Sequence, residues 1–170
     1  MIQFPPYEHD LLQRYRRGSV LIDANLLLLY VTGKTDRRII PRFQRTQKYT
    51  IRDFEILERL LEQFFRIVLT TPNILTEVSN LATKLSDSER PLFFDQMKKC
   101  IASLSEMYCH SNTAAGDRNY RTLGLTDAGI LTVCHGLLVL TDDLPLYSVL
   151  LSRGRDAINF THIRAVTTLQ

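Results

Sequence analysis

Acidic residues recur in this sequence at the points where an apolar stretch ends or where a helix is expected to begin. The positions are Asp23, Glu77, Asp127 and the adjacent pair Asp142-Asp143. The run Val20-Leu21-Ile22 before Asp23 has the aliphatic and β-branched composition of a buried parallel strand. An acid that closes such a strand lies at the carboxyl edge of the sheet, where open α/β folds bind their ligands. In a parallel sheet all these acidic positions converge on that edge.

Carboxylates that meet at one edge repel one another, which raises their pKa values and destabilises the fold unless a cation lies between them. Mg²⁺ and Mn²⁺ suit such a site because hard cations take oxygen ligands and keep waters for substrate phosphates. The pattern therefore predicts a metal site that activates water and neutralises charge on a phosphodiester. Taken singly, Asp127 and the pair Asp142-Asp143 can also be helix-capping residues, and Glu77 can be a solvated helical glutamate.

The elements that would position these acids follow from the spacing of apolar residues. Strands are expected at Val20–Ile22, Leu137–Thr141 and Ala157–Phe160, and a short fourth strand can form at Ile67–Leu69. Helices are expected at Tyr7–Arg17, after Asn25, at Asp53–Val68, from Pro72, from Ser86 to about Tyr108, at Thr126–Cys134 and at Leu144–Arg153. Residues 110–121 are expected to form a loop. Strands that alternate with helices predict an α/β protein, a three-layer α/β/α sandwich with a central parallel sheet.

The segment from Lys34 to Arg52 differs in composition, with seven Lys or Arg residues against the single acid Asp36. We interpret it as a basic insertion, irregular or with a short helix, in a single domain of residues 1–170 that begins with an extension at residues 1–17. Its cations are expected to contact RNA phosphates; they include Arg37, Arg38, Arg42, Arg45 and Lys48. Phe43 or Tyr49 can stack on an unpaired base. The alternative is a solvated basic loop that improves solubility.

The overall composition fits one globular domain and sets limits on the partners. The chain has 170 residues, of which 45% are hydrophobic and 23% are charged, and its net charge of +3 permits a polyanionic partner without requiring one. Three cysteines cannot all pair within the chain, so reduced thiols are expected. No apolar run is long enough to span a bilayer, and the N-terminus lacks the pattern of a signal peptide. These features predict a cytoplasmic protein with no membrane association.

The ordered set of motifs resembles the PIN domain, the metal-dependent nuclease fold of many toxin–antitoxin ribonucleases. The matching segments are Val20-Leu21-Ile22-Asp23-Ala24-Asn25, Thr71-Pro72-Asn73-Ile74-Leu75-Thr76-Glu77, Gly124-Leu125-Thr126-Asp127-Ala128-Gly129-Ile130 and Leu138-Val139-Leu140-Thr141-Asp142-Asp143-Leu144. Each segment is a weak signal alone, but together they keep the order and spacing of the family from Gly18 to about Phe160. The resemblance implies that Asp23, Glu77 and Asp127 are metal-site acids.

The resemblance also implies supporting residues and an activity. Asn25 would support the site by hydrogen bonding, and the family pattern of Ser or Thr, any residue, then Asp or Asn points to Asp143 as the fourth catalytic acid, with Thr141 beside it. Asp142 stays open as a metal ligand, because either carboxylate can turn inward. The implied activity is Mg²⁺- or Mn²⁺-dependent cleavage of RNA. For a toxin, an antitoxin protein would cover the acidic cleft and the chain would form a homodimer, although the extension and the insertion make this chain longer than compact toxins of the family.

Other classes of protein fit the sequence less well. A haloacid-dehalogenase-like phosphohydrolase needs a second Asp two residues after its nucleophile, where this chain has Asn25, and a receiver domain needs paired acids at its first strand. Nucleotide-binding glycine motifs and zinc-ligand spacings are absent from the sequence. The main alternative is a PIN-like module that binds RNA or a protein without cutting. The presence of all four acids favours the enzyme.

Overall fold

The computed structural model describes residues 4–168 and is built on five parallel strands in the order β3-β2-β1-β4-β5. The strands are β1 (Ser19–Ile22), β2 (Ile67–Thr70), β3 (Ser105–Glu106), β4 (Leu138–Thr141) and β5 (Ala157–Asn159). The helices are α1 (Pro6–Arg14), α2 (Ala24–Thr35), the 3-10 helix η1 (Arg37–Ile39), α3 (Ile51–Phe64), α4 (Pro72–Ala82), α5 (Glu89–Ser103), α6 (Ser111–Ala115), α7 (Tyr120–Val133), α8 (Leu144–Ser152) and α9 (Phe160–Thr168). The predicted three-layer α/β/α sandwich with a parallel sheet is confirmed.

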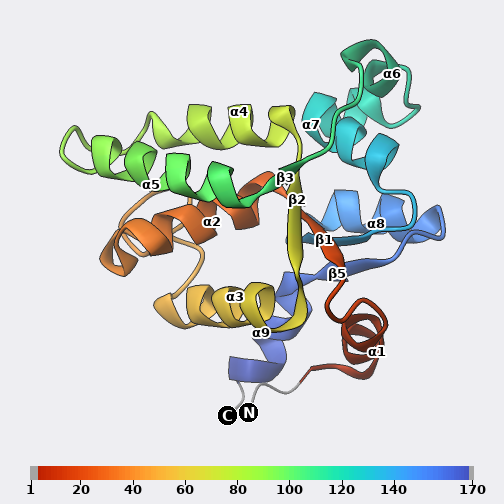
Figure 1. Cartoon of the computed structure of the whole chain (residues 1–170), viewed down its shortest axis with the longest axis horizontal. Coiled ribbons are helices and arrows are strands. Elements are labelled where there is room, and N and C mark those ends of the chain that lie inside the picture. Colours follow the sequence, from red (N-terminus) through yellow and green to blue (C-terminus); the bar gives the residue numbers. More distant parts are fainter. Residues whose placement is uncertain (1–3, 169–170) are drawn as a thin grey trace.

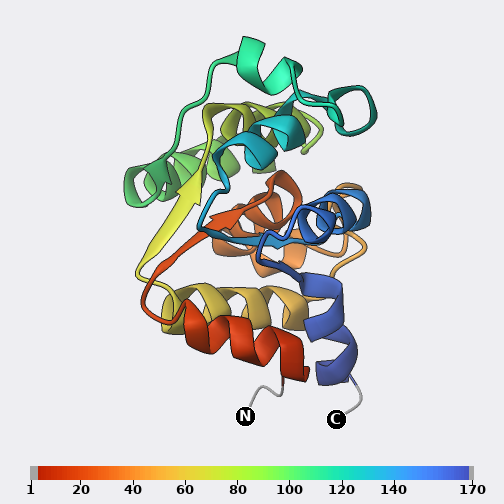
Figure 2. The same cartoon turned by 90° about the vertical axis from the view of Figure 1, so that its right-hand side faces the viewer.

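The side of the sheet on which the chain adds its strands reverses at β1, the central strand. The chain proceeds from β1 to β2 and β3 on one side, then returns to β4 and β5 on the other side of β1. Because crossovers between parallel strands are right-handed, this reversal places the two sets of helices on opposite faces. Figure 1 shows α2, α3, α4 and α5 to the left of the sheet and α1, α7 and α8 to the right, and Figure 2 shows the second set from the front.

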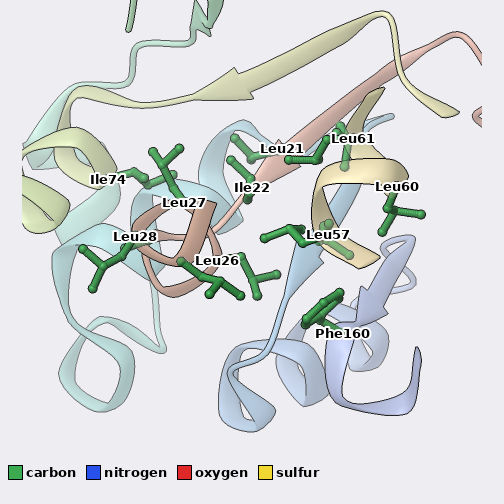
Figure 3. Close-up of a cluster of buried hydrophobic side chains, with 14 of the residues drawn as sticks. Leu21, Ile22, Leu26, Leu27, Leu28, Leu57, Leu60, Leu61, Ile74 and Phe160 are labelled. Atoms are coloured by element: carbon green, nitrogen blue, oxygen red, sulfur yellow. The ribbon is translucent and has the colours of Figure 1, made fainter. Parts of the chain in front are cut away.

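Helix α2 lies at the centre of the core, between the sheet and α3, α4 and α5. Its run Leu26-Leu27-Leu28-Leu29 has no polar face, and all four side chains are buried. A helix that is apolar on all sides is stable only when other elements surround it. Figure 3 shows Leu26, Leu27 and Leu28 beside Ile22 of β1, Leu57 of α3 and Ile74 of α4. The helix that follows the first acid is therefore fixed by packing on several sides.

Several predicted boundaries are wrong. The helix expected to reach Tyr108 ends at Ser103, and Ser105–Glu106 pairs with β2 as an edge strand that leaves Tyr108 71% exposed. The segment expected to be a loop, residues 110–121, contains α6 and the start of α7. Helix α7 then breaks at Gly124, whose φ of 83° only glycine adopts readily, so a separate helical turn carries Asp127. The last strand ends at Asn159, because the buried Phe160 begins α9.

The basic segment at residues 34–52 packs on the body of the protein and is not a loop in solvent. Its apolar residues Ile39, Ile40, Phe43 and Tyr49 are buried. The prediction that Phe43 or Tyr49 stacks on an unpaired base is wrong, because their exposed fractions are only 5% and 2%. These aromatic residues anchor the segment instead. No helix among residues 4–168 is long and apolar enough to cross a bilayer.

Candidate functional site

Asp23 lies between the carboxyl ends of β1 and β4, the strands at which the chain changes direction. Its Oδ1 caps α2 by accepting a hydrogen bond of 2.8 Å from the N–H of Leu26. Its Oδ2 accepts hydrogen bonds from the hydroxyl of Thr141 and, at 3.1 Å, from the N–H of Asp142. Ligands of open α/β folds bind at such a switch point. The predicted position of Asp23 at the carboxyl edge is therefore the position that the structure gives it.

The environment of Asp23 disfavours its negative charge. The side chain is 2% exposed, and this burial raises its pKa to about 7, with a further contribution from the charge of Asp142. Hydrogen bonds from Thr141, Leu26 and Asp142 act in the opposite direction and do not cancel the burial. Carboxylates with pKa values near neutrality are concentrated at catalytic and ligand sites.

Asp127 joins this acidic edge from the segment of α7 after Gly124. It is half-buried, and burial is the main cause that raises its pKa to about 7. The charges of Asp143, Asp23 and Glu77 raise the pKa further, in that order of size. The charges of three acids that are distant in the sequence therefore act on Asp127 in the folded chain. The predicted convergence of the acids and the predicted direction of the pKa shift both hold for Asp127.

Glu77 lies at an open cleft beside these acids. The cleft has a volume of about 290 Å³ and runs between α4 and α7, which lie side by side in Figures 1 and 2. Its other lining residues are Asn73, Thr76, Asn80, Leu125 and Thr126. Thr71 caps α4 by accepting the N–H of Ile74 at 3.2 Å, which fixes where the helix begins and hence which face carries Glu77. A polar ligand in this cleft would lie beside Glu77.

The two acids after β4 face different partners. Asp143 caps α8 by accepting the N–H of Leu146 at 2.8 Å, and its own N–H donates to the hydroxyl oxygen of Thr141 at 2.9 Å. Thr141 therefore links Asp143 to Asp23. The Oδ2 of Asp142 instead accepts a hydrogen bond from the hydroxyl of Tyr49 and lies 2.7 Å from the Nζ of Lys48.

Tyr49 is the residue of this site that sequence reasoning missed. Burial and the charge of Asp142 raise the pKa of Tyr49 above its usual value, so the phenol remains a neutral donor. The only signal in the sequence was an aromatic residue inside a polar, basic segment, which does not identify its partner. Asn25 is half-buried and makes no side-chain hydrogen bond within residues 4–168, so its supporting role stays a prediction.

The acidic set fits a hydrated hard cation better than a closed metal cage. Among residues 4–168, no three His, Cys, Asp or Glu side chains are arranged to hold a metal ion by themselves. Mg²⁺ usually keeps several waters and takes only one or two carboxylates plus substrate phosphates. Asp23 Oδ1 accepts one hydrogen bond and retains a free lone pair. The raised pKa values of Asp23 and Asp127 would return towards normal beside a cation.

Most cations expected to contact RNA pair with acids of the chain itself. The ion pairs join Arg37 to Glu55 and Glu58, Arg38 to Asp36, Arg42 to Glu89, and Lys48 to Asp142. Arg45 is exposed and has no ion pair in the part of the chain that the structure describes. Contacts of these five residues with RNA stay a prediction, and Lys48 is the one among them that pairs with an acid of the site.

Comparison with known proteins adds no relative. No family model matches the chain, and no curated protein matches it in sequence. Functional inference therefore depends on the site geometry and on the residues themselves.

The acids predict how the stability of the metal-free protein depends on pH. Asp23 and Asp127 have folded pKa values of about 7 against the ordinary value of 3.8, so the folded state binds more protons between these pH values. The free energy of unfolding should therefore fall as pH rises through this interval, and the protein should be less stable at about pH 8 than at about pH 5. Urea denaturation in EDTA measures the change. Asp127→Asn should reduce the fall, and a stability that rises with pH would contradict the prediction.

Proposed function

We propose that this chain is a metal-dependent endoribonuclease, a single PIN-like domain that hydrolyses RNA phosphodiesters with Mg²⁺ or Mn²⁺. One observation carries the proposal. Asp23 lies at the switch point of a parallel sheet, and its charge acts on Asp127 together with the charges of Glu77 and Asp143. Such a set is unfavourable alone and favourable around a cation, which is typical of sites that process phosphate esters.

The residues of the site have distinct roles in this proposal. When bound, the metal ion lowers the pKa of a water and neutralises charge on the phosphodiester. Asp23, Glu77, Asp127 and Asp143 hold the ion directly or through its waters. Thr141 fixes the relative positions of Asp23 and Asp143 through its hydroxyl.

The same proposal includes the partners and the location of the protein. RNA enters through the cleft beside Glu77, with Arg45 and Lys48 available for phosphate contacts after the ion pair of Lys48 rearranges. An antitoxin protein that covers the acidic edge and a homodimer are part of the proposal only for the toxin form. The free thiols Cys100, Cys109 and Cys134 suit a reducing cytoplasm.

A second candidate is a PIN-like module that binds RNA or a protein without cleaving it. Two observations favour it. No three potential metal ligands among the described residues are arranged around one point, and Lys48 already neutralises one of the acids. Both are also compatible with an enzyme that completes its site with water and substrate.

Cleavage of a mixed RNA pool distinguishes the two candidates. The purified protein is incubated with the RNA and Mn²⁺ or Mg²⁺, beside an EDTA control. Cleavage that EDTA abolishes would support the nuclease. Intact RNA together with no metal uptake in calorimetry would favour the binding module, whereas metal uptake without cleavage would indicate an enzyme selective for another RNA.

A further inference from the structure

Within the described part of the chain, Asp142 is the one acid of the site that is already paired with a cation. Its side chain is 2% exposed, while that of Lys48 is 50% exposed. The Oδ2 atom receives the Tyr49 hydroxyl and lies 2.7 Å from Lys48 Nζ, and the Oδ1 atom is buried without a hydrogen-bond partner. A buried carboxylate keeps its charge only when such a pairing compensates for the loss of water. The pairing residues come from the segment at 34–52, so this segment contributes directly to the site.

We propose that Lys48 and Tyr49 are positioning residues that hold Asp142 in an internal ion pair and thereby keep it out of the cation site. The site then forms from Asp23, Glu77, Asp127 and Asp143. The inference deepens the proposed function, since it rests on a cation site at these acids. In this way the basic segment at residues 34–52 limits the negative charge of the site.

Lys48 and Tyr49 are held in place by contacts with other parts of the chain. Tyr49 is buried, the Lys48 ammonium lies 5.0 Å from its ring centroid and the Arg164 guanidinium lies 5.1 Å from it. Arg164 of α9 also donates to the backbone oxygen of Lys48 at 2.8 Å and pairs with Asp53 of α3 at 3.0 Å. The basic segment, α3 and α9 are thus fixed to one another behind Asp142. Separation of Lys48 from Asp142 therefore requires only a movement of the Lys48 side chain, which is half-exposed.

Asp142 lies between Asp23 on one side and Lys48 and Tyr49 on the other, which explains why it needs an ion pair. Its backbone N–H donates to Asp23, and its charge acts on Asp23. An unpaired Asp142 would add a further negative charge directly beside the buried Asp23 carboxylate. The ammonium of Lys48 offsets part of that charge without removing the carboxylate. Asp143, one residue later, is the acid whose charge contributes most to raising the pKa of Asp127.

The test measures Mn²⁺ affinity by isothermal titration calorimetry in four proteins: the wild type, Lys48→Met, Asp142→Asn and the double variant. Methionine keeps the aliphatic stem of Lys48 while it removes the ammonium. Arg45→Met is the matched control, because Arg45 is an exposed cation of the same segment and has no ion pair among the described residues. Tyr49→Phe keeps the buried ring and removes only the hydroxyl that donates to Asp142.

Lys48→Met is expected to tighten Mn²⁺ binding about three- to tenfold, because a freed carboxylate beside the site strengthens its attraction for a cation. Tyr49→Phe should tighten it less, and Arg45→Met should leave it unchanged. The double variant, which removes both charges of the pair, should bind Mn²⁺ as tightly as the wild type does. A gain that persists in the double variant would overturn the inference, since Lys48 would then act only through its general field. Weaker binding in the double variant than in the wild type would also overturn it, because Asp142 would then be a ligand.

Failure of the inference and failure of the proposed function give different results. RNA cleavage by the wild type with no effect of Lys48→Met on Mn²⁺ affinity would overturn the inference alone. If no protein binds Mn²⁺ and the wild type does not cleave RNA, the proposed function fails. The inference would fail with it, and a coupling of Lys48 to Asp142 in urea denaturation would then identify the pair as purely structural.

Discussion

Asp23→Asn is expected to reduce metal-dependent RNA cleavage by on the order of 10³-fold, equivalent to about 4 kcal/mol of transition-state stabilisation. Asp23 is the most buried of the four acids and the one at the switch point of the sheet. Its replacement removes a full negative charge from a buried position, where the effective dielectric constant is low and charges interact most strongly. Initial rates with a fixed RNA and saturating Mn²⁺ measure the loss.

The fold should survive this substitution. An asparagine keeps the size of the side chain and is a good N-cap for α2. It cannot accept all three hydrogen bonds that Asp23 accepts from Leu26, Thr141 and Asp142, because one of its two terminal atoms is a donor. That loss opposes the gain from removing a buried charge. Circular dichroism and the melting temperature should therefore change little in EDTA.

Two further variants make the result interpretable. Asp127→Asn removes the same charge at a half-buried position and breaks no side-chain hydrogen bond within the described residues, so its activity loss cannot come from capping. Asp10→Asn is the surface control, because the Asp10 side chain is 82% exposed. Full cleavage by folded Asp23→Asn protein would remove Asp23 from the mechanism. Cleavage that neither Asp23→Asn nor Asp127→Asn reduces would end the four-acid proposal.

The sequence was sufficient to predict those features that depend on repeated local signals. The apolar strands before Asp23 and Asp142, and the helix that Thr71 and Pro72 begin, each carry such a signal over several residues. The strand at Ser105–Glu106 carries no such signal, because two residues are too few to show alternation. Its pairing with β2 depends on tertiary contacts. The same reason explains why the preceding helix was extended too far.

Partners across long sequence distances were also beyond prediction. A Lys-Tyr pair in a basic segment indicated contact with nucleic acid, yet Lys48 and Tyr49 contact Asp142, more than half the chain away. Asp142 and Asp143 are indistinguishable by type and local pattern. The three-dimensional contacts separate them, since one acid receives the basic segment and the other caps α8.

Gly33→Ala is expected to destabilise the protein by about 3 kcal/mol, the upper part of the range for overpacked cores. A Cβ atom at Gly33 would lie 2.2 Å from Cδ2 of the Phe54 ring and 2.5 Å from Cγ. Phe54 is completely buried, so the ring cannot move into solvent. Helix α2 and helix α3 approach each other closely only because this position lacks a side chain. The helix propensity of alanine returns about 1 kcal/mol and does not offset the clash.

Gly129→Ala is the matched control, because Gly129 also lies inside a helix, α7. Its Cβ would meet Asn73 Nδ2 and Cys109 Sγ at 3.7 Å, an ordinary contact distance. The control should be neutral or more stable by up to about 1 kcal/mol. For a chain of this size 1 kcal/mol corresponds to about 2–4 °C in melting temperature, so the two variants should separate clearly in thermal unfolding.

The double variant Gly33→Ala with Phe54→Leu tests the cause of the destabilisation. Phe54→Leu alone should destabilise the protein because it leaves space beside α2. In its presence the methyl group introduced by Gly33→Ala can occupy that space, so the two effects should fall short of their sum by more than about 1 kcal/mol. Strict additivity in urea denaturation would show that the Gly33 effect does not arise from the Phe54 ring. Non-additivity would establish that the close approach of Gly33 to the Phe54 ring sets the distance between α2 and α3. That distance in turn sets the orientation of α2, the helix that Asp23 caps.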